Sequence, residues 1–94
     1  MALMFQLSEF GQTFATRDRG DELRRTLLER AHGQDAVVVD FAGVTSVSYS
    51  FADEFLGKLC ADAGLRLERR NLTPRIAAIA DRAVARRAGS TIAC

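Results

Sequence analysis

The sequence predicts a single α/β domain with one sheet of about four strands and helices mainly on one face. Strand-like and helix-like patterns alternate in the order β-β-α-β-α-β-α, which is typical of strands joined by right-handed helical crossovers. The chain has 94 residues, of which 48% are hydrophobic and 27% charged, so it can build one core and little more. We expect the domain to span residues 1–89 and residues 90–94 to form a C-terminal tail.

The first half of the chain predicts three strands and one helix. Strands are expected at residues 2–7 and 13–15, where short apolar runs adjoin turn residues. The helix would be capped by Thr16 or Asp18 and would end before Gly33. Its buried face would carry four residues at helical spacing, Leu23, Leu27, Leu28 and Ala31. Residues 36–41 form a β-branched run without alternation, which indicates a central strand buried on both faces.

The second half predicts a loop, two helices and one strand. Residues 43–47 would connect to a helix over residues 51–63 that ends at Gly64. The outer half of this helix would carry Asp53, Glu54, Lys58 and Asp62. Its inner half would carry Phe51, Ala52, Phe55, Leu56, Leu59, Cys60 and Ala63. Residues 65–69 alternate, which predicts a strand with one solvent-exposed face. Thr73, as cap, and Pro74, at the first helical position, begin a last helix that would bury Ile76, Ile79, Ala80 and Ala83.

The charge distribution is asymmetric although the net charge is only +1. Residues 1–65 hold six basic and ten acidic residues, a sum of −4, whereas residues 66–94 hold seven Arg and two acids, a sum of +5. Three arginines of the last helix, Arg75, Arg82 and Arg86, would form one stripe and are candidates for contacting a polyanion. The alternative is a solvated basic helix that faces acidic neighbours of its own chain.

The sequence contains no recognisable catalytic machinery. Asp53 and Glu54 are adjacent, so on a helix their carboxylates diverge by about 100° and cannot flank one reacting group. We find no glycine-rich phosphate loop, and the single His and two Cys do not have ligand spacing, so no enzyme activity, metal or cofactor is expected. The absence of a long apolar run or a basic leader predicts a soluble, cytoplasmic protein.

Residues 37–59 carry a resemblance to a known family. They read VVVDFAGVTSVSYSFADEFLGKL. The pairs Asp40-Phe41 and Gly43-Val44 and the helix start at residues 50–54 resemble the STAS-like family of uncharacterised bacterial domains. Arg17 and Asn71 match the same pattern on either side. The resemblance covers nearly the whole chain, and it implies a STAS-like fold and a role in protein binding rather than an activity.

That family is similar to STAS domains, the anti-sigma-factor antagonists, and this likeness aligns Ser50 with their phosphorylated serine. In those antagonists a loop with the sequence Asp-Ser-Ser-Gly-Leu-Gly follows the central strand, and its second Ser is phosphorylated by a partner kinase. That serine falls on Ser50, whereas Ser48, Tyr49 and Phe51 stand where the antagonists have Asp, Ser and Gly. The acceptor hydroxyl is therefore kept and the motif around it is lost.

Three interpretations of Ser50 remain open. Ser50 and Asp53 have the spacing of a capping box, in which each side chain bonds the other's backbone N–H. A phosphoryl group on Ser50 would instead be favoured by the helix N-terminus, although Asp53 and Glu54 would repel it. Ser50 could also contact a partner without modification. Tyr49 would either pack over the helix start or be exposed at a contact.

These observations predict a regulatory interaction module. The resemblance implies a protein partner, such as a histidine-kinase-like ATPase or a sigma-regulatory protein, bound through the loop and helix around residues 45–58. The candidate contact residues are Ser48, Tyr49, Ser50, Asp53 and Glu54. The alternative is binding of nucleic acid or another polyanion through the arginine-rich C-terminal segment. A homodimer formed along an exposed edge strand is a further possibility.

Overall fold

The computed structural model describes residues 2–62 and 66–88 and has the mixed α/β architecture expected of a STAS-like fold. Three parallel strands, β1 (Ala2–Gln6), β3 (Ala36–Asp40) and β5 (Arg66–Arg70), form one sheet in the order β1-β3-β5. The register aligns Phe5 with Val39 and Val39 with Arg69. A second, two-stranded parallel sheet pairs β2 (Thr13–Phe14) with β4 (Ser46–Val47).

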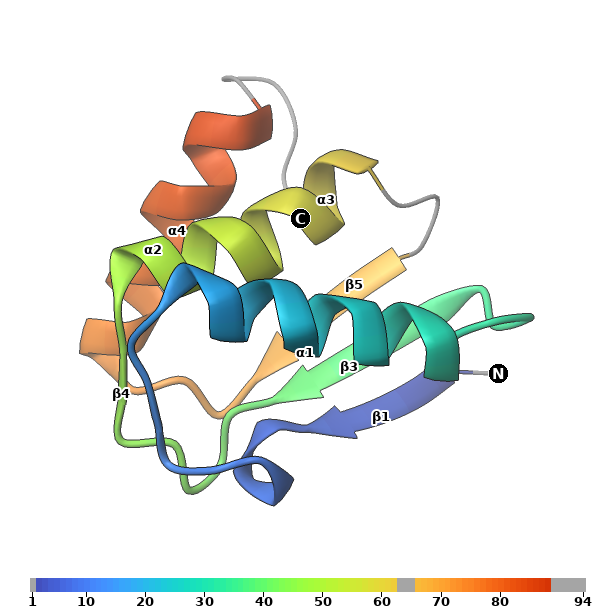
Figure 1. The fold of residues 1–94 in the computed structure, drawn as a ribbon, viewed down its shortest axis with the longest axis horizontal. Coiled ribbons are helices and arrows are strands. Elements are labelled where there is room, and N and C mark those ends of the chain that lie inside the picture. Colours follow the sequence, from blue (N-terminus) through green and yellow to red (C-terminus); the bar gives the residue numbers. More distant parts are fainter. Residues whose placement is uncertain (1, 63–65, 89–94) are drawn as a thin grey trace.

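The helices lie together on one side of the three-stranded sheet (Figure 1). The 3-10 turn η1 (Leu7–Glu9) follows β1, and α1 (Arg17–Arg30) connects β2 to β3. A continuous helical stretch then runs through α2 (Tyr49–Ala52), the π-helical turn η2 (Asp53–Gly57) and α3 (Lys58–Asp62). The last helix is α4 (Pro74–Ala88). None of the helices in the described part of the chain is both long and apolar enough to span a membrane.

The core lies between the three-stranded sheet and the helices. Phe5, Val37 and Val39 pack toward the helices and are fully buried. Phe51 and Phe55 of the α2–η2 stretch stack with ring centroids 5.4 Å apart, and Phe55 also approaches Phe5 at 6.1 Å. Because burial of one such side chain stabilises a fold by roughly 1.5–3 kcal/mol, this phenylalanine cluster fixes the α2–η2 stretch against the sheet.

Several predictions from local pattern are confirmed. The strand predicted at residues 36–41 is the central strand β3, which ends one residue earlier at Asp40, and Val38 is only 8% exposed even though it points away from the helices. Thr16 caps α1 by accepting a hydrogen bond from the backbone N–H of Arg19 at 3.1 Å. Thr73 likewise accepts from the N–H of Ile76 at 3.2 Å, which is the expected cap before Pro74. Cys60 is partly buried against the core, whereas residues 90–94, with Cys94, lie outside the described residues.

Other predictions are wrong in detail. Residues 46–47 form β4 rather than part of a loop, so the strands divide into sheets of three and two. A two-residue strand with one apolar member has no period to detect. The second helix begins at Tyr49, two residues before the predicted start at Phe51, and contains a π-helical turn. Leu28, predicted to be buried, is 42% exposed because α1 presents only the narrower stripe of Leu23 and Leu27 to the core.

Candidate functional site

The cap of α2 is Ser48 and not Ser50. The Ser48 hydroxyl accepts a hydrogen bond from the backbone N–H of Phe51 at 3.0 Å, and Ser48 has the extended backbone of an N-cap residue. Ser50 lies inside the first turn of α2, and Asp53 is engaged elsewhere, so the predicted capping box between them does not form. Ser48 is thus a structural residue, and Ser50 has no capping role.

Tyr49 and Ser50 form the accessible part of the helix start. Both side chains are partly exposed. Within the described part of the chain, neither side-chain hydroxyl has a hydrogen-bond partner, and the Tyr49 ring is in no ring–ring contact. These two residues are therefore held in place by a capped helix while their polar groups stay available.

Asp53 and Glu54 point into the molecule, contrary to the prediction that they lie on the outer half of their helix. They are 6% and 5% exposed. Four cations surround them, and we call these six residues the ionic cluster: Arg17, Arg24, Asp53, Glu54, Lys58 and Arg87. Asp53 and Glu54 turn inward because residues 53–57 have π-helical hydrogen bonding, with one more residue in each bonded turn. Three of the cations that hold them also come from other helices, α1 and α4.

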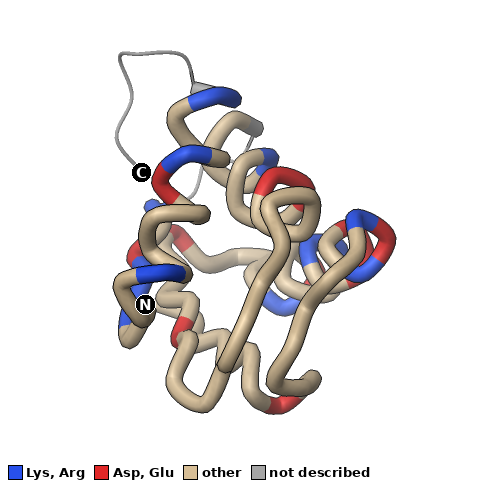
Figure 2. The backbone as a smooth tube through the Cα atoms, turned by 90° about the vertical axis from the view of Figure 1, so that its left-hand side faces the viewer, with Lys and Arg blue, Asp and Glu red and all other residues tan. Residues whose placement is uncertain are grey.

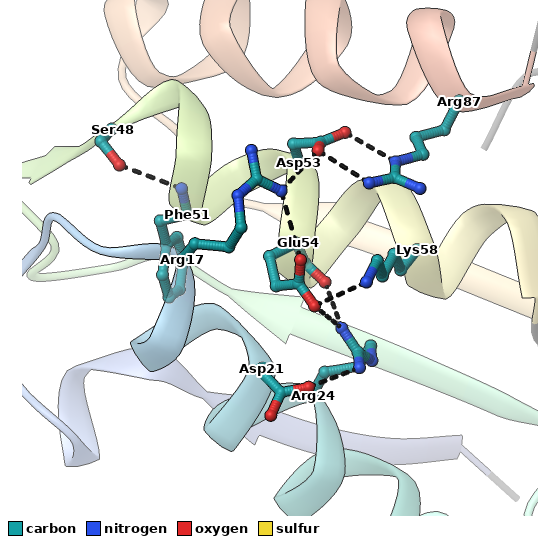
Figure 3. Close-up of polar contacts among 9 residues, drawn as sticks. All are labelled: Arg17, Asp21, Arg24, Ser48, Phe51, Asp53, Glu54, Lys58 and Arg87. Carbon is teal, nitrogen blue, oxygen red and sulfur yellow. Dashed lines mark hydrogen bonds and ion pairs between the residues drawn. The ribbon is translucent and has the colours of Figure 1, made fainter.

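Asp53 joins α1 and α4 through two arginines. Arg87 donates from Nε and Nη2 to the two carboxylate oxygens of Asp53, at 2.8 and 2.9 Å (Figure 3). Arg17 donates from Nη1 to Asp53 Oδ2 at 2.8 Å. The bidentate Arg87 pair holds the pKa of the Asp53 carboxyl well below its usual range, with Arg17 contributing and burial opposing.

Glu54 joins α1 to α3. Lys58 Nζ lies 2.8 Å from Glu54 Oε2, and Arg24 Nη1 donates both to that oxygen and to the backbone carbonyl of Glu54, each at 2.7 Å (Figure 3). Arg17 Nη1 also reaches Glu54 Oε1 at 3.2 Å. These hydrogen bonds, led by that of Lys58, lower the pKa of Glu54 to about 2 against the opposing effect of burial.

Two glycines allow the helices to approach the cluster closely. A Cβ on Gly20 of α1 would lie 2.9 Å from the carbonyl oxygen of Phe51 and 3.0 Å from Glu54 Cβ. A Cβ on Gly57 would lie 2.9 Å from Arg87 Cγ and 3.2 Å from Asp53 Oδ1. The side chains of the cluster are thereby packed between α1, the continuous α2–η2–α3 stretch and α4, so the cluster fixes the direction in which α2 presents Tyr49 and Ser50.

The other residues that carried the family resemblance also pair with one another. Asn71 Nδ2 donates to Asp40 Oδ1 at 2.9 Å, and the N–H of Ala42 donates to the same oxygen at 2.9 Å. These bonds lower the pKa of Asp40, that of Asn71 most. Asn71 adopts a positive φ of 61°, a conformation that Asn tolerates better than most residues. The Asp40–Asn71 pair thus joins the ends of β3 and β5, as Arg17 joins α1 to η2.

The arginine stripe of α4 is separate from the ionic cluster. Arg75, Arg82 and Arg86 are all exposed, and none has an ion-pair partner within the described ranges. The single carboxylate of the described part of α4, on Asp81, pairs with Arg69 of β5 at 2.9 Å instead. The alternative that the stripe faces acidic neighbours of its own chain therefore finds no support among residues 2–62 and 66–88.

Sequence reasoning missed Arg24, Arg87, Gly20 and Gly57. The one available signal was the presence of two adjacent acids followed by Lys58 at the i+4 spacing of a helical ion pair. The remaining partners lie 30 to 37 residues away along the chain, beyond the reach of any local pattern. Among the described residues, no three His, Cys, Asp or Glu side chains gather in a way that could hold a metal ion.

Comparisons with known proteins agree with this fold. A family model described as a STAS-like domain of unknown function matches residues 19–77, more than half of the chain. No match was found among curated proteins or among solved structures. The match contains Asp40 and Asn71, which pair across the strand ends, and Asp53 and Glu54, whose inward turn builds the ionic cluster. This chain belongs to the family of STAS-like domains of unknown function.

Proposed function

We propose that the protein is a non-enzymatic regulatory module that binds a protein partner through residues 45–58, with Tyr49 and Ser50 at the centre of the contact. The observation that carries this proposal is that the residues that stabilise the start of α2 differ from those that are accessible there. Ser48 caps the helix and Asp53 and Glu54 hold it from within. Tyr49 and Ser50 are partly exposed, and no group in the described part of the chain bonds their hydroxyls. Tyrosine is enriched among the residues that dominate binding energy at protein interfaces.

Asp53 and Glu54 support the site without touching the partner. Their carboxylates are buried and bonded to four cations, so a partner could reach them only by breaking those pairs. Preorganisation of this kind lowers the entropy lost on binding, because the helix start is already held in one conformation. The surface left for contact runs from the exposed Thr45 and Ser46 to Tyr49 and Ser50.

The likeness to the anti-sigma-factor antagonists supports a histidine-kinase-like ATPase or a sigma-regulatory protein as the partner. The same likeness supports phosphorylation of Ser50. A phosphoryl group there would add about −1.5 to −2 charges at the partly exposed start of α2. The inward turn of Asp53 and Glu54 removes the two nearest acids of the helix from that surface. Phosphorylation would therefore change the charge of the contact surface and could release the partner.

A capture experiment tests the proposal. Wild type, Tyr49→Ala, Ser50→Ala and Ser50→Asp would serve as bait in extracts of the source cells, and Met4→Ala would be the control, since Met4 is 48% exposed on the opposite face of the sheet. We expect one discrete partner that Tyr49→Ala and Ser50→Asp lose and that Ser50→Ala and Met4→Ala retain. Equal recovery with every bait of unchanged melting temperature would reject the contact surface.

A further inference from the structure

A groove lies between β4 and the first half of α4, beside the proposed contact surface. It encloses about 320 Å³. Its lining residues are Thr45, Ser46, Val47, Arg75, Ile76 and Ile79. The side of the molecule that bears α4 and β4 in Figure 1 is turned toward the viewer in Figure 2. The groove thus lies between a strand of the proposed contact segment and the start of the arginine stripe, at Arg75.

The strand side of the groove offers backbone groups. The N–H groups of Ser46 and Ser48 both point toward β2, where they bond the carbonyls of Gln12 and Phe14 at 3.4 and 2.9 Å. Successive residues of a strand direct their backbone groups to opposite edges, so the N–H and C=O of Val47 point away from β2. The edge of β4 away from β2 therefore carries one donor and one acceptor, both on Val47, which is also one of the residues that line the groove.

The helix side of the groove offers charge and apolar surface. Arg75, Ile79, Arg82 and Arg86 are spaced so that they fall within about 60° of one another around α4. The three arginines extend over about 16 Å along the helix axis. They have no carboxylate partner within the described residues, whereas most other described arginines are ion-paired. Ile79, which is partly buried, places an apolar side chain between the first two arginines.

We propose that this groove binds an extended acidic segment of the protein partner. The backbone of the segment pairs with the edge of Val47, its carboxylates face Arg75 and Arg82, and an apolar residue between them contacts Ile79. At roughly 3.3 Å per residue, a segment of about five residues spans the stripe. This inference rests on the proposed function and extends it by naming the chemistry of the bound segment.

A peptide fits this surface better than a nucleic acid does. Strand addition uses main-chain groups for affinity and side-chain contacts for specificity, and the groove supplies both. Single-stranded nucleic acids instead need aromatic side chains on which bases stack, and α4 contains none. The apolar contribution of Ile76 and Ile79 to the lining also has no use in binding phosphates.

The test is an amide NMR titration of the isotope-labelled protein with a capped peptide of sequence Val-Glu-Val-Asp-Val-Glu. We expect shifts concentrated at residues 45–47 and 75–79 and saturable binding. Arg75→Gln/Arg82→Gln should weaken that binding by about tenfold or more. The matched control Arg25→Gln/Arg66→Gln removes the same charge from exposed positions on α1 and β5 and should leave affinity within about twofold. A peptide with Gln and Asn in place of the acids should not bind.

Three results would overturn the inference. These are no saturable binding of the acidic peptide, equal weakening by both double variants, and tighter binding of an oligothymidine of equal charge through the same arginines. The capture experiment separates this failure from failure of the proposed function. If Arg75→Gln/Arg82→Gln retains the partner that Tyr49→Ala loses, the contact surface stands and the groove is not part of it. If the peptide binds the groove while no bait loses a partner, the groove stands and the contact at Tyr49 fails.

Discussion

At the scale of single residues, neighbouring serines have different roles. Ser48 satisfies the backbone N–H of Phe51, one of the first-turn donors that an α-helix leaves unbonded. Ser50 lies two residues later, inside the first turn, and its hydroxyl has no hydrogen-bond partner within the described residues. A hydroxyl that stabilises the fold and a hydroxyl available for contact or modification thus lie two residues apart.

Replacement of each serine by alanine distinguishes these roles. Ser48→Ala removes the cap and should lower the free energy of unfolding by about 1 kcal/mol. Ser50→Ala should change it by less than about 0.5 kcal/mol, because no structural hydrogen bond is lost. Urea unfolding of both variants beside wild type measures the difference. A larger loss for Ser50→Ala than for Ser48→Ala would mean that Ser50 is the cap after all.

The sequence alone could not choose between these serines. Ser50 and Asp53 have the better capping-box spacing, and nothing local shows that Asp53 is held by Arg87 and Arg17. The cap of α4, Thr73, was predictable, and that of α1 was narrowed to Thr16 or Asp18, because no distant group competes with either threonine. Local sequence therefore predicts a helix cap well, except where a distant ion pair engages one residue of the predicted capping box.

At the scale of secondary-structure elements, glycine sets the distance between helices. Gly20 lets α1 approach the backbone of α2 and η2, which brings Arg17 and Arg24 within reach of Asp53 and Glu54. The apolar run of β3 and the alternation of β5 were readable from sequence because a strand buried on both faces is apolar throughout, whereas a strand buried on one face alternates. The turn at residues 53–57 was not readable, because a π-helical insertion is a response to packing.

Gly20→Ala tests this close approach. Alanine in a helix interior is normally favoured over glycine by about 1 kcal/mol. Here the added Cβ would lie 2.9 Å from the Phe51 carbonyl oxygen, so we expect a net loss of roughly 1–3 kcal/mol. Glu29→Ala, at an exposed position of the same helix, is the control and should stay within about 0.5 kcal/mol of wild type. A more stable Gly20→Ala variant would contradict the packing described here.

At the scale of the whole molecule, the ionic cluster links α1, η2, α3 and α4 and should make stability depend on pH. The pKa of Glu54 is lowered to about 2 and that of Asp53 is lowered as well, so both carboxylates bind protons less readily in the folded state than in the unfolded chain. Their stabilisation is complete above the unfolded pKa and is lost as pH falls through the folded one. The pH window is therefore acidic, from about pH 5 down to about pH 2.

Unfolding measurements across that pH range test whether the ionic cluster stabilises the fold in this pH-dependent way. The urea midpoint of wild type should be steady above about pH 5 and fall steeply toward about pH 2. Glu54→Gln should cost about 3–5 kcal/mol near neutral pH, since Arg24 and Lys58 lose their shared carboxylate, and its stability should fall less on acidification. Glu29→Gln should follow wild type. Parallel curves for Glu54→Gln and wild type would show that Glu54 is not the titrating group.

The proposed function requires a protein partner to bind at Tyr49, on the helical stretch that the ionic cluster holds in place. The most direct test places a photo-crosslinking phenylalanine analogue at Tyr49 and, as control, at the exposed Met4, in the full-length chain inside its source cells. We predict one covalent adduct of defined mass with the analogue at Tyr49 and none with it at Met4. No adduct at Tyr49, or the same adducts from both positions, would contradict the claim.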